Sequence, residues 1–148
     1  MLGVSSAEVA ARGALLDALE ALQSHRDAVI LIGAQAIYLQ TGEAPVALSP
    51  FTKDTDLAID TRALRDDPRI ERAMMAAGFV LDPVAVQPGT WISRDGIPVD
   101  LMVPEALSGP RGRRSARIPP HATNAARRAV GLEAAVVDNQ MQRHASRI

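Results

Sequence analysis

The chain of 148 residues contains no cysteine and only one lysine, Lys53. The absence of cysteine excludes disulfide bonds and zinc sites with thiolate ligands, and it suits the reducing cytoplasm in which we expect the protein to act. Long apolar runs are missing as well, because the most apolar stretch, residues 28–34, is far shorter than the about 20 residues that cross a bilayer. Glu8, Arg12 and Asp17 stand where a signal peptide would be apolar. We therefore expect no export and no membrane partner.

Acidic residues are missing between Glu105 and Glu133, although the formal net charge of the chain is only -1. All the charged residues of this interval are arginines: Arg111, Arg113, Arg114, Arg117, Arg127 and Arg128. A basic segment attracts phosphate groups, so the first four of them are candidates for contact with RNA. The other interpretation, a solvated arginine-rich loop, stays open.

Apolar residues make up 47% of the chain and charged residues 22%, which is typical of one globular domain. Hydrophobic periodicity and turn residues divide the chain into helices and strands. Helices are predicted at residues 6–23 and 34–40 and near residues 67–78, and strands at residues 28–32, 53–59, 90–94 and 97–103. This order predicts an α/β or α+β fold in which helices flank a small mixed sheet.

Local signals set the ends of several predicted elements. In the first helix one leucine stripe is expected to face the core: Leu15, Leu16, Leu19 and Leu22. Asp67 followed by Pro68 predicts a helix start, and Gly78 predicts the end of that helix. The Asp-Gly pair at residues 95–96 predicts a hairpin turn between the last two strands.

The part of the chain after Val103 is rich in glycine, proline and arginine as far as residue 124, which predicts a long surface loop. Residues 127–138 are expected to form one more strand or hairpin. The histidines show no ligand spacing and are interpreted as ordinary surface or loop residues: His25, His121 and His144.

Two aspartates, Asp54 and Asp56, stand in the strand predicted over residues 53–59. Side chains alternate across a strand, so both acids share one face, about 6.6 Å apart at the backbone, and can bind one hard cation or an adjacent pair of cations. The other face carries the residues Thr55, Leu57 and Ile59. Lys53 precedes the pair and is a candidate contact for a phosphate, although alternation places it opposite Asp54. A polar strand start or a turn cap is the structural alternative for a lone Asp-x-Asp pair.

A third carboxylate, Asp100, follows the same alternation in the second hairpin strand, where the aliphatic residues are Val99, Leu101 and Val103. If the two strands are neighbours, Asp100 joins Asp54 and Asp56. Three crowded carboxylates repel one another unless a cation neutralises them. The grouping therefore predicts a divalent ion, Mg²⁺ or Mn²⁺.

Three segments, "LIGAQAIYLQTG", "TKDTDLAID" and "PVDLM", together resemble the DNA polymerase beta-type nucleotidyltransferase superfamily and, within it, the AbiEii-like group of toxin-type nucleotidyltransferases. In that pattern Gly33 matches a small residue of the phosphate-binding turn. Asp54 and Asp56 match the acid pair, and Asp100 matches the third acid.

The domain that this resemblance implies is a single nucleotidyltransferase-like unit over residues 1–148. Its core is residues 28–103, which the similarity covers, and residues 104–124 are its arginine-rich loop. Members of the group continue into a helical part that supplies a lysine, and we expect this part to be missing here. Ala34 also replaces the second glycine or serine of the turn.

The activity that the resemblance implies is transfer of a nucleotide from a nucleoside triphosphate (NTP) to an acceptor hydroxyl, with RNA as a candidate acceptor. Divalent ions on Asp54 and Asp56 would position the triphosphate, and Asp100 would help to activate the hydroxyl. Backbone N–H groups at Gly33 and Ala34 would bind phosphates at the start of a helix.

A non-catalytic domain of the same fold is the alternative hypothesis; it would bind nucleotide, nucleic acid or a protein partner such as an antitoxin. The acid triad favours the enzyme, whereas Ala34 and the expected loss of the helical part favour the non-catalytic domain. A metal-dependent hydrolase, or a glycosyltransferase that uses the Asp-x-Asp pair on a nucleotide sugar, is a third hypothesis.

Overall fold

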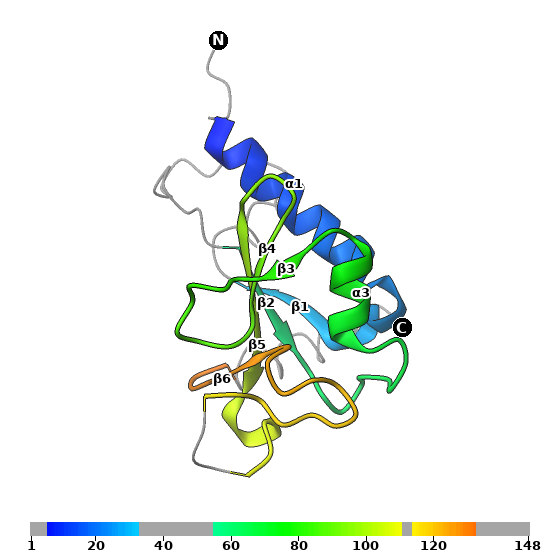
Figure 1. Cartoon of the computed structure of the whole chain (residues 1–148). Coiled ribbons are helices and arrows are strands. Elements are labelled where there is room, and N and C mark those ends of the chain that lie inside the picture. The colour runs from blue at the N-terminus through cyan, green and yellow to red at the C-terminus, as the bar shows by residue number, and fades with distance from the viewer. Residues whose placement is uncertain (1–5, 33–54, 111–113, 133–148) are drawn as a thin grey trace.

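The computed structural model describes residues 6–32, 55–110 and 114–132 (Figure 1). In these residues the fold is mixed α+β, with a six-stranded sheet and helices beside it. This confirms the predicted fold class of a small mixed sheet with flanking helices. None of the helices within the described ranges is both long and apolar enough to cross a membrane.

The sheet is organised around β5, which pairs with three other strands. The strands are β1 (Val29–Ile32), β2 (Thr55–Ile59), β3 (Val80–Leu81), β4 (Thr90–Ile92), β5 (Pro98–Pro104) and β6 (Arg127–Ala129). One edge of β5 pairs in parallel with β2, which pairs antiparallel with β1. The other edge pairs antiparallel with β4 through its first residues and in parallel with β6 through its last. β3 extends the sheet beyond β4.

The helices of the described residues are α1 (Ser6–Ala21), α3 (Ile70–Ala76) and the 3₁₀ helices η1 (Gln23–Ala28) and η2 (Glu105–Leu107). Both α1 and α3 pack against the same face of the sheet (Figure 1), because their buried residues belong to one cluster with those of β2 and β5. We call this the helix-covered face and the opposite one the second face. The predicted helix at residues 34–40 lies outside the described residues.

The buried stripe of α1 differs from the prediction at one position. Leu15 and Leu22 are buried and Leu19 is partly buried, as predicted, but Leu16 is 49% exposed. Alanines complete the stripe instead: Ala11, Ala14 and Ala18. One residue turns a helix by about 100°, so Leu16 falls outside the face that Leu15 and Ala18 share.

The start of α3 lies later than predicted. Asp67 is not the cap, because the helix begins at Ile70 and Arg69 precedes it in an extended conformation. The backbone N–H of Ile70 donates to Nδ1 of His121 (3.0 Å). A ring nitrogen from a distant segment therefore satisfies one of the free N–H groups of the first turn.

The end of α3 at Gly78 is confirmed. Gly78 has φ +91°, which favours glycine, and its N–H donates to the carbonyl of Met75 (3.0 Å). The N–H of Phe79 donates to the carbonyl of Met74 (3.0 Å). This pair of bonds is a Schellman motif, and the buried side chains of Met74 and Phe79 accompany it.

The predicted hairpin of β4 and β5 is also confirmed. Ser93 donates its N–H to the carbonyl of Ile97 (2.9 Å), and a short connection with Gly96 at φ +79° joins the strands. This register places Thr90 opposite Asp100.

The described residues of the segment 104–124 are mostly irregular and many are exposed, as predicted for a loop, but some of their side chains are buried. Ser108, Ala116 and Ile118 are buried, and the Ser108 hydroxyl donates to the carbonyls of Val103 and Pro104. The segment folds back on the sheet because these short and apolar side chains join the core cluster or its edge.

Two histidines that we interpreted as surface or loop residues are buried, so neither is a surface histidine, although His121 does lie in an irregular segment. His25 is 2% exposed and donates from Nε2 to the carbonyl of Pro68 (2.6 Å). His121 is 5% exposed and donates from Nε2 to the carbonyl of Arg65 (2.8 Å). Their rings meet edge to face, with centroids 5.7 Å apart. They join the chain before α3 to η1 and to the segment after η2; His144 lies outside the described residues.

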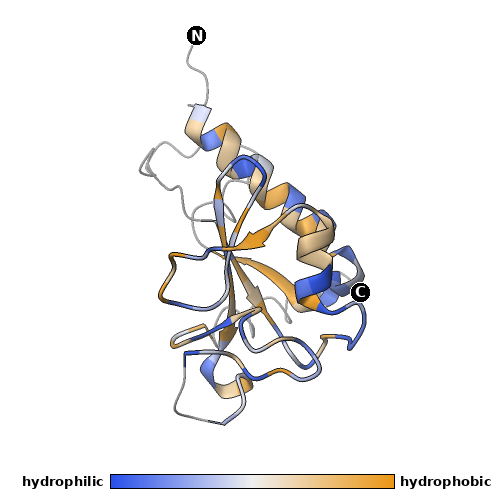
Figure 2. Ribbon diagram, in the orientation of Figure 1, coloured by the Kyte–Doolittle hydropathy of each residue, from blue (hydrophilic) through white to orange (hydrophobic). Residues whose placement is uncertain are grey.

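The main core lies between the sheet and the helices, and Figure 2 shows apolar ribbon in the central part of the sheet. Its largest fully buried side chains include Trp91, Phe79, Leu57 and Leu101. The Trp91 indole N–H donates to the carbonyl of Ala125 (3.0 Å), so the residues before β6 are tied to the core as well.

Candidate metal site

The alternation predicted for β2 is present, and it explains the threonine between the two aspartates. Thr55 is fully buried on the helix-covered face, where its hydroxyl donates to the carbonyl of Ala11 in α1 (3.4 Å). Leu57 and Ile59 are buried on the same face. Asp56 and Ala58 consequently point to the second face.

Asp56 and Asp100 lie side by side on the second face. β2 and β5 are parallel neighbours, and their register pairs Asp56 directly with Asp100. Adjacent strands are about 4.8 Å apart, so the two carboxylates are within reach of one ion. Both residues are only partly buried. The strands of these acids are therefore neighbours, which is the condition that the sequence hypothesis set for Asp100.

The neighbouring residues of the second face surround this pair with polar and apolar side chains in known register. Across the sheet the row of Asp56 and Asp100 continues to Ile32 on β1 and to Thr90 on β4. The next row contains aliphatic residues and an arginine: Ile30, Ala58, Met102 and Arg127. Ile30 and Ala58 are buried, with Ile32 and Leu132 packed against them. The two carboxylates thus lie at the edge of a small apolar cluster.

Asp100 is held by two side chains that the sequence analysis did not assign to the site. The Thr90 hydroxyl donates to Oδ1 of Asp100 (2.6 Å), and Nη1 of Arg127 donates to the same oxygen (3.2 Å). Nη1 of Arg127 also lies 3.3 Å from the carbonyl of Pro88 and 3.4 Å from the Thr90 hydroxyl. The predicted hairpin came within one residue of Thr90: a two-residue turn at Asp95 and Gly96 sets Trp91 opposite Asp100, whereas the observed register sets Thr90 there. Arg127 had no comparable signal, because its strand pairs with β5 from a distant part of the chain.

Gly89 lies where β4 and β6 meet beside β5, and its lack of a side chain lets Thr90 and Arg127 reach the same carboxylate. It has φ +85°, and a Cβ there would lie 2.6 Å from the carbonyl oxygen of Leu101 and 2.7 Å from the backbone nitrogen of Arg127. Its N–H donates to the carbonyl of Asn124 (3.1 Å). β4 and β6 share one edge of β5 at this point, and only glycine fits between them.

The donor chemistry of this pair fits a hard divalent cation, because carboxylate oxygens are the ligands that Mg²⁺ and Mn²⁺ prefer. In the described residues no group of three His, Cys, Asp or Glu side chains is placed to hold a metal ion. Asp54, the third acid of the hypothesis, lies outside those residues, as do Gly33, Ala34 and Lys53. The part of the site that can be located is therefore the pair of Asp56 and Asp100.

A fully buried carboxylate near this strand, that of Asp60, has a structural partner. Asp60, just after β2, is fully buried, and its side chain accepts bonds from the backbone N–H and the guanidinium of Arg62. These hydrogen bonds and the negative charge of Asp60 raise the pKa of Arg62 above its usual value. Asp60 caps the following turn and lies at the far end of β2 from Asp56.

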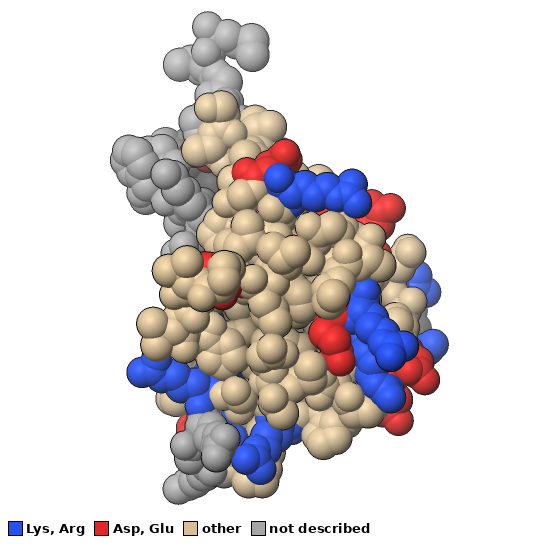
Figure 3. Space-filling model, in the orientation of Figure 1, with Lys and Arg blue, Asp and Glu red and all other residues tan. Residues whose placement is uncertain are grey.

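The arginines of the acid-free interval fall into two groups. Arg114 and Arg117 are exposed, and Figure 3 shows arginine atoms along the lower edge, where Figure 1 places η2 and the residues after it. Arg127 and Arg128 make hydrogen bonds within the protein. Arg128 donates to the carbonyls of Ser108, Gly109 and Pro110. Arg111 and Arg113 lie outside the described residues.

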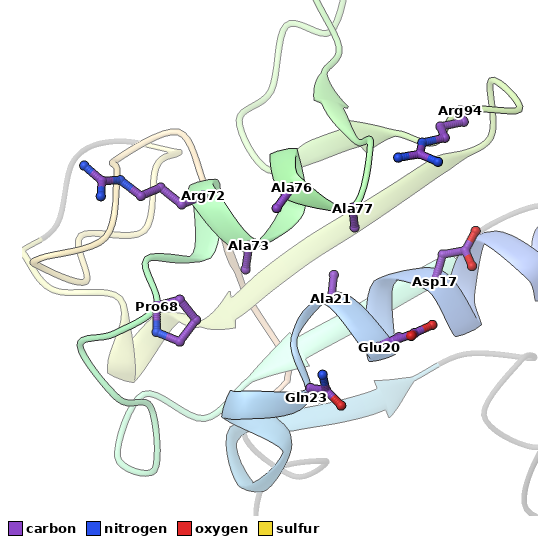
Figure 4. A pocket seen from close by; sticks show the side chains of 10 residues that line it. All are labelled: Asp17, Glu20, Ala21, Gln23, Pro68, Arg72, Ala73, Ala76, Ala77 and Arg94. Atoms are coloured by element: carbon purple, nitrogen blue, oxygen red, sulfur yellow. The ribbon is translucent and has the colours of Figure 1, made fainter.

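A separate groove of about 710 Å³ lies between α1 and α3 (Figure 4). Its walls carry charges of both signs over alanines, and its lining residues are Asp17, Glu20, Ala21, Gln23, Pro68, Arg72, Ala73, Ala76, Ala77 and Arg94. It opens on the helix side of the sheet. None of the described residues of the candidate site lines it.

Comparison with known proteins adds no assignment: no family model, no curated protein and no solved structure matches this chain.

Proposed function

We propose that this protein is a metal-dependent nucleotidyltransferase that transfers a nucleotide from an NTP to an acceptor hydroxyl. The observation that carries the proposal is the direct pairing of Asp56 with Asp100 on neighbouring parallel strands. Carboxylates placed together on one face, beside an apolar cluster, form a site that a divalent cation would neutralise. The resemblance to the nucleotidyltransferase superfamily names the same two residues.

The hydrogen bonds to Asp100 support different roles for its two carboxylate oxygens, one bonded to the protein and one to the metal. Thr90 and Arg127 approach from the β4 and β6 edge of β5, and both bond to Oδ1. Oδ1 is therefore engaged on that side, and we assign Oδ2 to the metal, because Asp56 is the register partner of Asp100 on β2. Asp56 and Oδ2 of Asp100 would hold the ion, which would neutralise the triphosphate and lower the pKa of the acceptor hydroxyl.

The remaining roles stay predictions. Asp54 would complete the ligand set, and the turn at Gly33 and Ala34, with Lys53, would bind the phosphates. RNA is the acceptor that we favour, contacted by the arginine-rich loop through Arg111, Arg113, Arg114 and Arg117. A toxin-type role in the cytoplasm, with an antitoxin-type protein partner, completes the proposal.

The test is incubation of the purified protein with Mg²⁺, each labelled NTP and total RNA. We expect label on RNA with the wild type, and a loss of about a hundredfold or more with Asp56→Asn and with Asp100→Asn. Asp66→Asn is the matched control, since Asp66 is an exposed acid before α3. Equal labelling by the wild type and both site variants, or no labelling with any NTP, would contradict the proposal.

A non-catalytic domain that binds nucleotide or nucleic acid is the second candidate, and the ion pair of Arg127 with Asp100 favours it. An arginine that permanently neutralises the third acid would leave a site that binds anions without metal. In that case the wild type would bind ATP equally well with Mg²⁺ and with EDTA, whereas the enzyme requires Mg²⁺.

A further inference from the structure

Arg127 is held beside Asp100 by several contacts and is mostly buried. Its side chain is 16% exposed, and that of Asp100 is 22% exposed. Three acceptors surround Nη1: the carbonyl of Pro88, the hydroxyl of Thr90 and Oδ1 of Asp100. The positive charge is therefore held beside the carboxylate by Thr90 on β4 and by Pro88 just before it, as well as by the carboxylate itself.

A divalent ion on Asp100 would lie close to this guanidinium. Ligand oxygens stand about 2.0–2.6 Å from Mg²⁺, Mn²⁺ or Ca²⁺, and Nη1 is 3.2 Å from the other oxygen of the same carboxyl group. Two cations sharing one carboxylate repel each other, and partial burial weakens the screening of that repulsion by water. The arginine also holds the rotamer of Asp100, which favours metal binding, but a single rotamer restriction changes an affinity by only a few-fold.

We propose that Arg127 is the resident cation of Asp100 and keeps the affinity of the site for a free divalent ion low. This inference rests on the proposed function, because it takes Asp100 as a metal ligand. Charge repulsion outweighs rotamer control, so removal of the charge at position 127 strengthens metal binding. The ligand that relieves the repulsion is an anion of the polyphosphate class, whose oxygens compete with Asp100 for the guanidinium.

The test is the affinity for Mn²⁺ alone, measured by electron paramagnetic resonance of the free ion. We expect Arg127→Gln to bind Mn²⁺ about tenfold more tightly than the wild type. Arg127→Lys keeps the charge but cannot reproduce the contacts of the guanidinium, so its affinity stays within about threefold of the wild type. Arg117→Gln removes one charge at an exposed position and serves as the matched control, with no expected change.

The lysine variant separates this role from a purely structural one. If Arg127 only supports the fold or orients Asp100, both Arg127→Gln and Arg127→Lys weaken Mn²⁺ binding, and the inference is overturned. If Arg127→Gln does not fold, as judged by circular dichroism, the result for Arg127→Lys still decides between the two roles. Wild-type binding without a gain in Arg127→Gln overturns this inference alone, whereas no binding by any variant overturns the proposed function with it.

Discussion

Two neighbouring residues of β5 show how differently the two faces of the sheet are built. Leu101 is fully buried against the helices, whereas the Asp100 side chain keeps 22% of its surface exposed on the second face. The same contrast holds on β2, where Leu57 is fully buried and Asp56 only partly. One face is closed by α1 and α3, and the other places the carboxylates beside Thr90 and Arg127.

The difference teaches that stability and chemistry are separable along the same strands. Substitutions on the helix-covered face should act on the free energy of unfolding, and those at Asp56 and Asp100 should act on metal binding. Three substitutions challenge this separation, beginning with the one for which we expect the largest effect.

Leu101→Ala tests the helix-covered face. Deletion of a fully buried leucine side chain removes apolar contacts and leaves a cavity, so we expect a loss of about 3 kcal/mol in the free energy of unfolding. Urea unfolding followed by circular dichroism measures it. Asp100→Asn, one residue away, keeps Oδ1 as an acceptor and should cost within about 1 kcal/mol. A larger loss for Asp100→Asn than for Leu101→Ala would reverse the comparison.

Gly89→Ala tests the position where β4 and β6 meet beside β5. The new Cβ would meet backbone atoms of Leu101 and Arg127 at 2.6 and 2.7 Å, and the residue would keep φ near +85°. We expect a loss of about 2 kcal/mol in stability. Gly96→Ala is the control, because Gly96 has a similar φ of +79° but no atom within 4 Å of the added Cβ. Equal losses for both variants would show that backbone strain alone, and not the close approach, matters at Gly89.

Thr55→Val, at the residue between the two aspartates, should have the smallest effect of the three on stability. Valine keeps the shape but loses the long hydrogen bond to the Ala11 carbonyl, so stability should fall by about 0.5–1 kcal/mol. Thr55 faces the helices, and the Mn²⁺ affinity should therefore equal that of the wild type. A change in Mn²⁺ affinity without a change in stability would mean that Thr55 reaches the metal site.

Much of the fold could be predicted because the signals are local. Alternation on β2 and β5, the hairpin at Gly96 and the stop at Gly78 each depend on residues within a few positions of one another. The same alternation predicted that Asp56 and Asp100 would point away from the aliphatic face.

The wrong predictions concern residues whose hydrogen-bond partners are distant in sequence. His25 and His121 are buried because carbonyls of Pro68 and Arg65, 43 and 56 residues away, accept their ring N–H groups. Likewise α3 begins where His121 accepts the N–H of Ile70, and no local cap residue announces that start.

In the candidate site the residue missed most completely was Arg127. It reaches Asp100 across 27 positions of sequence, and only the parallel pairing of β6 with β5 brings the two together. Composition had marked Arg127 as one of several arginines in a basic segment. Its partner, and therefore its role, depended on the topology.

The account depends most on the convergence of Asp56 and Asp100 on one cation. The direct measurement is paramagnetic broadening of backbone amide signals in a two-dimensional NMR spectrum during addition of substoichiometric Mn²⁺. We predict that the amides of Asp56 and Asp100 broaden first, and that Asp56→Asn abolishes the effect at both. Early broadening confined to the exposed acids Asp66 and Asp67 or to the groove acids Asp17 and Glu20, with no effect at Asp56 and Asp100, would contradict the account.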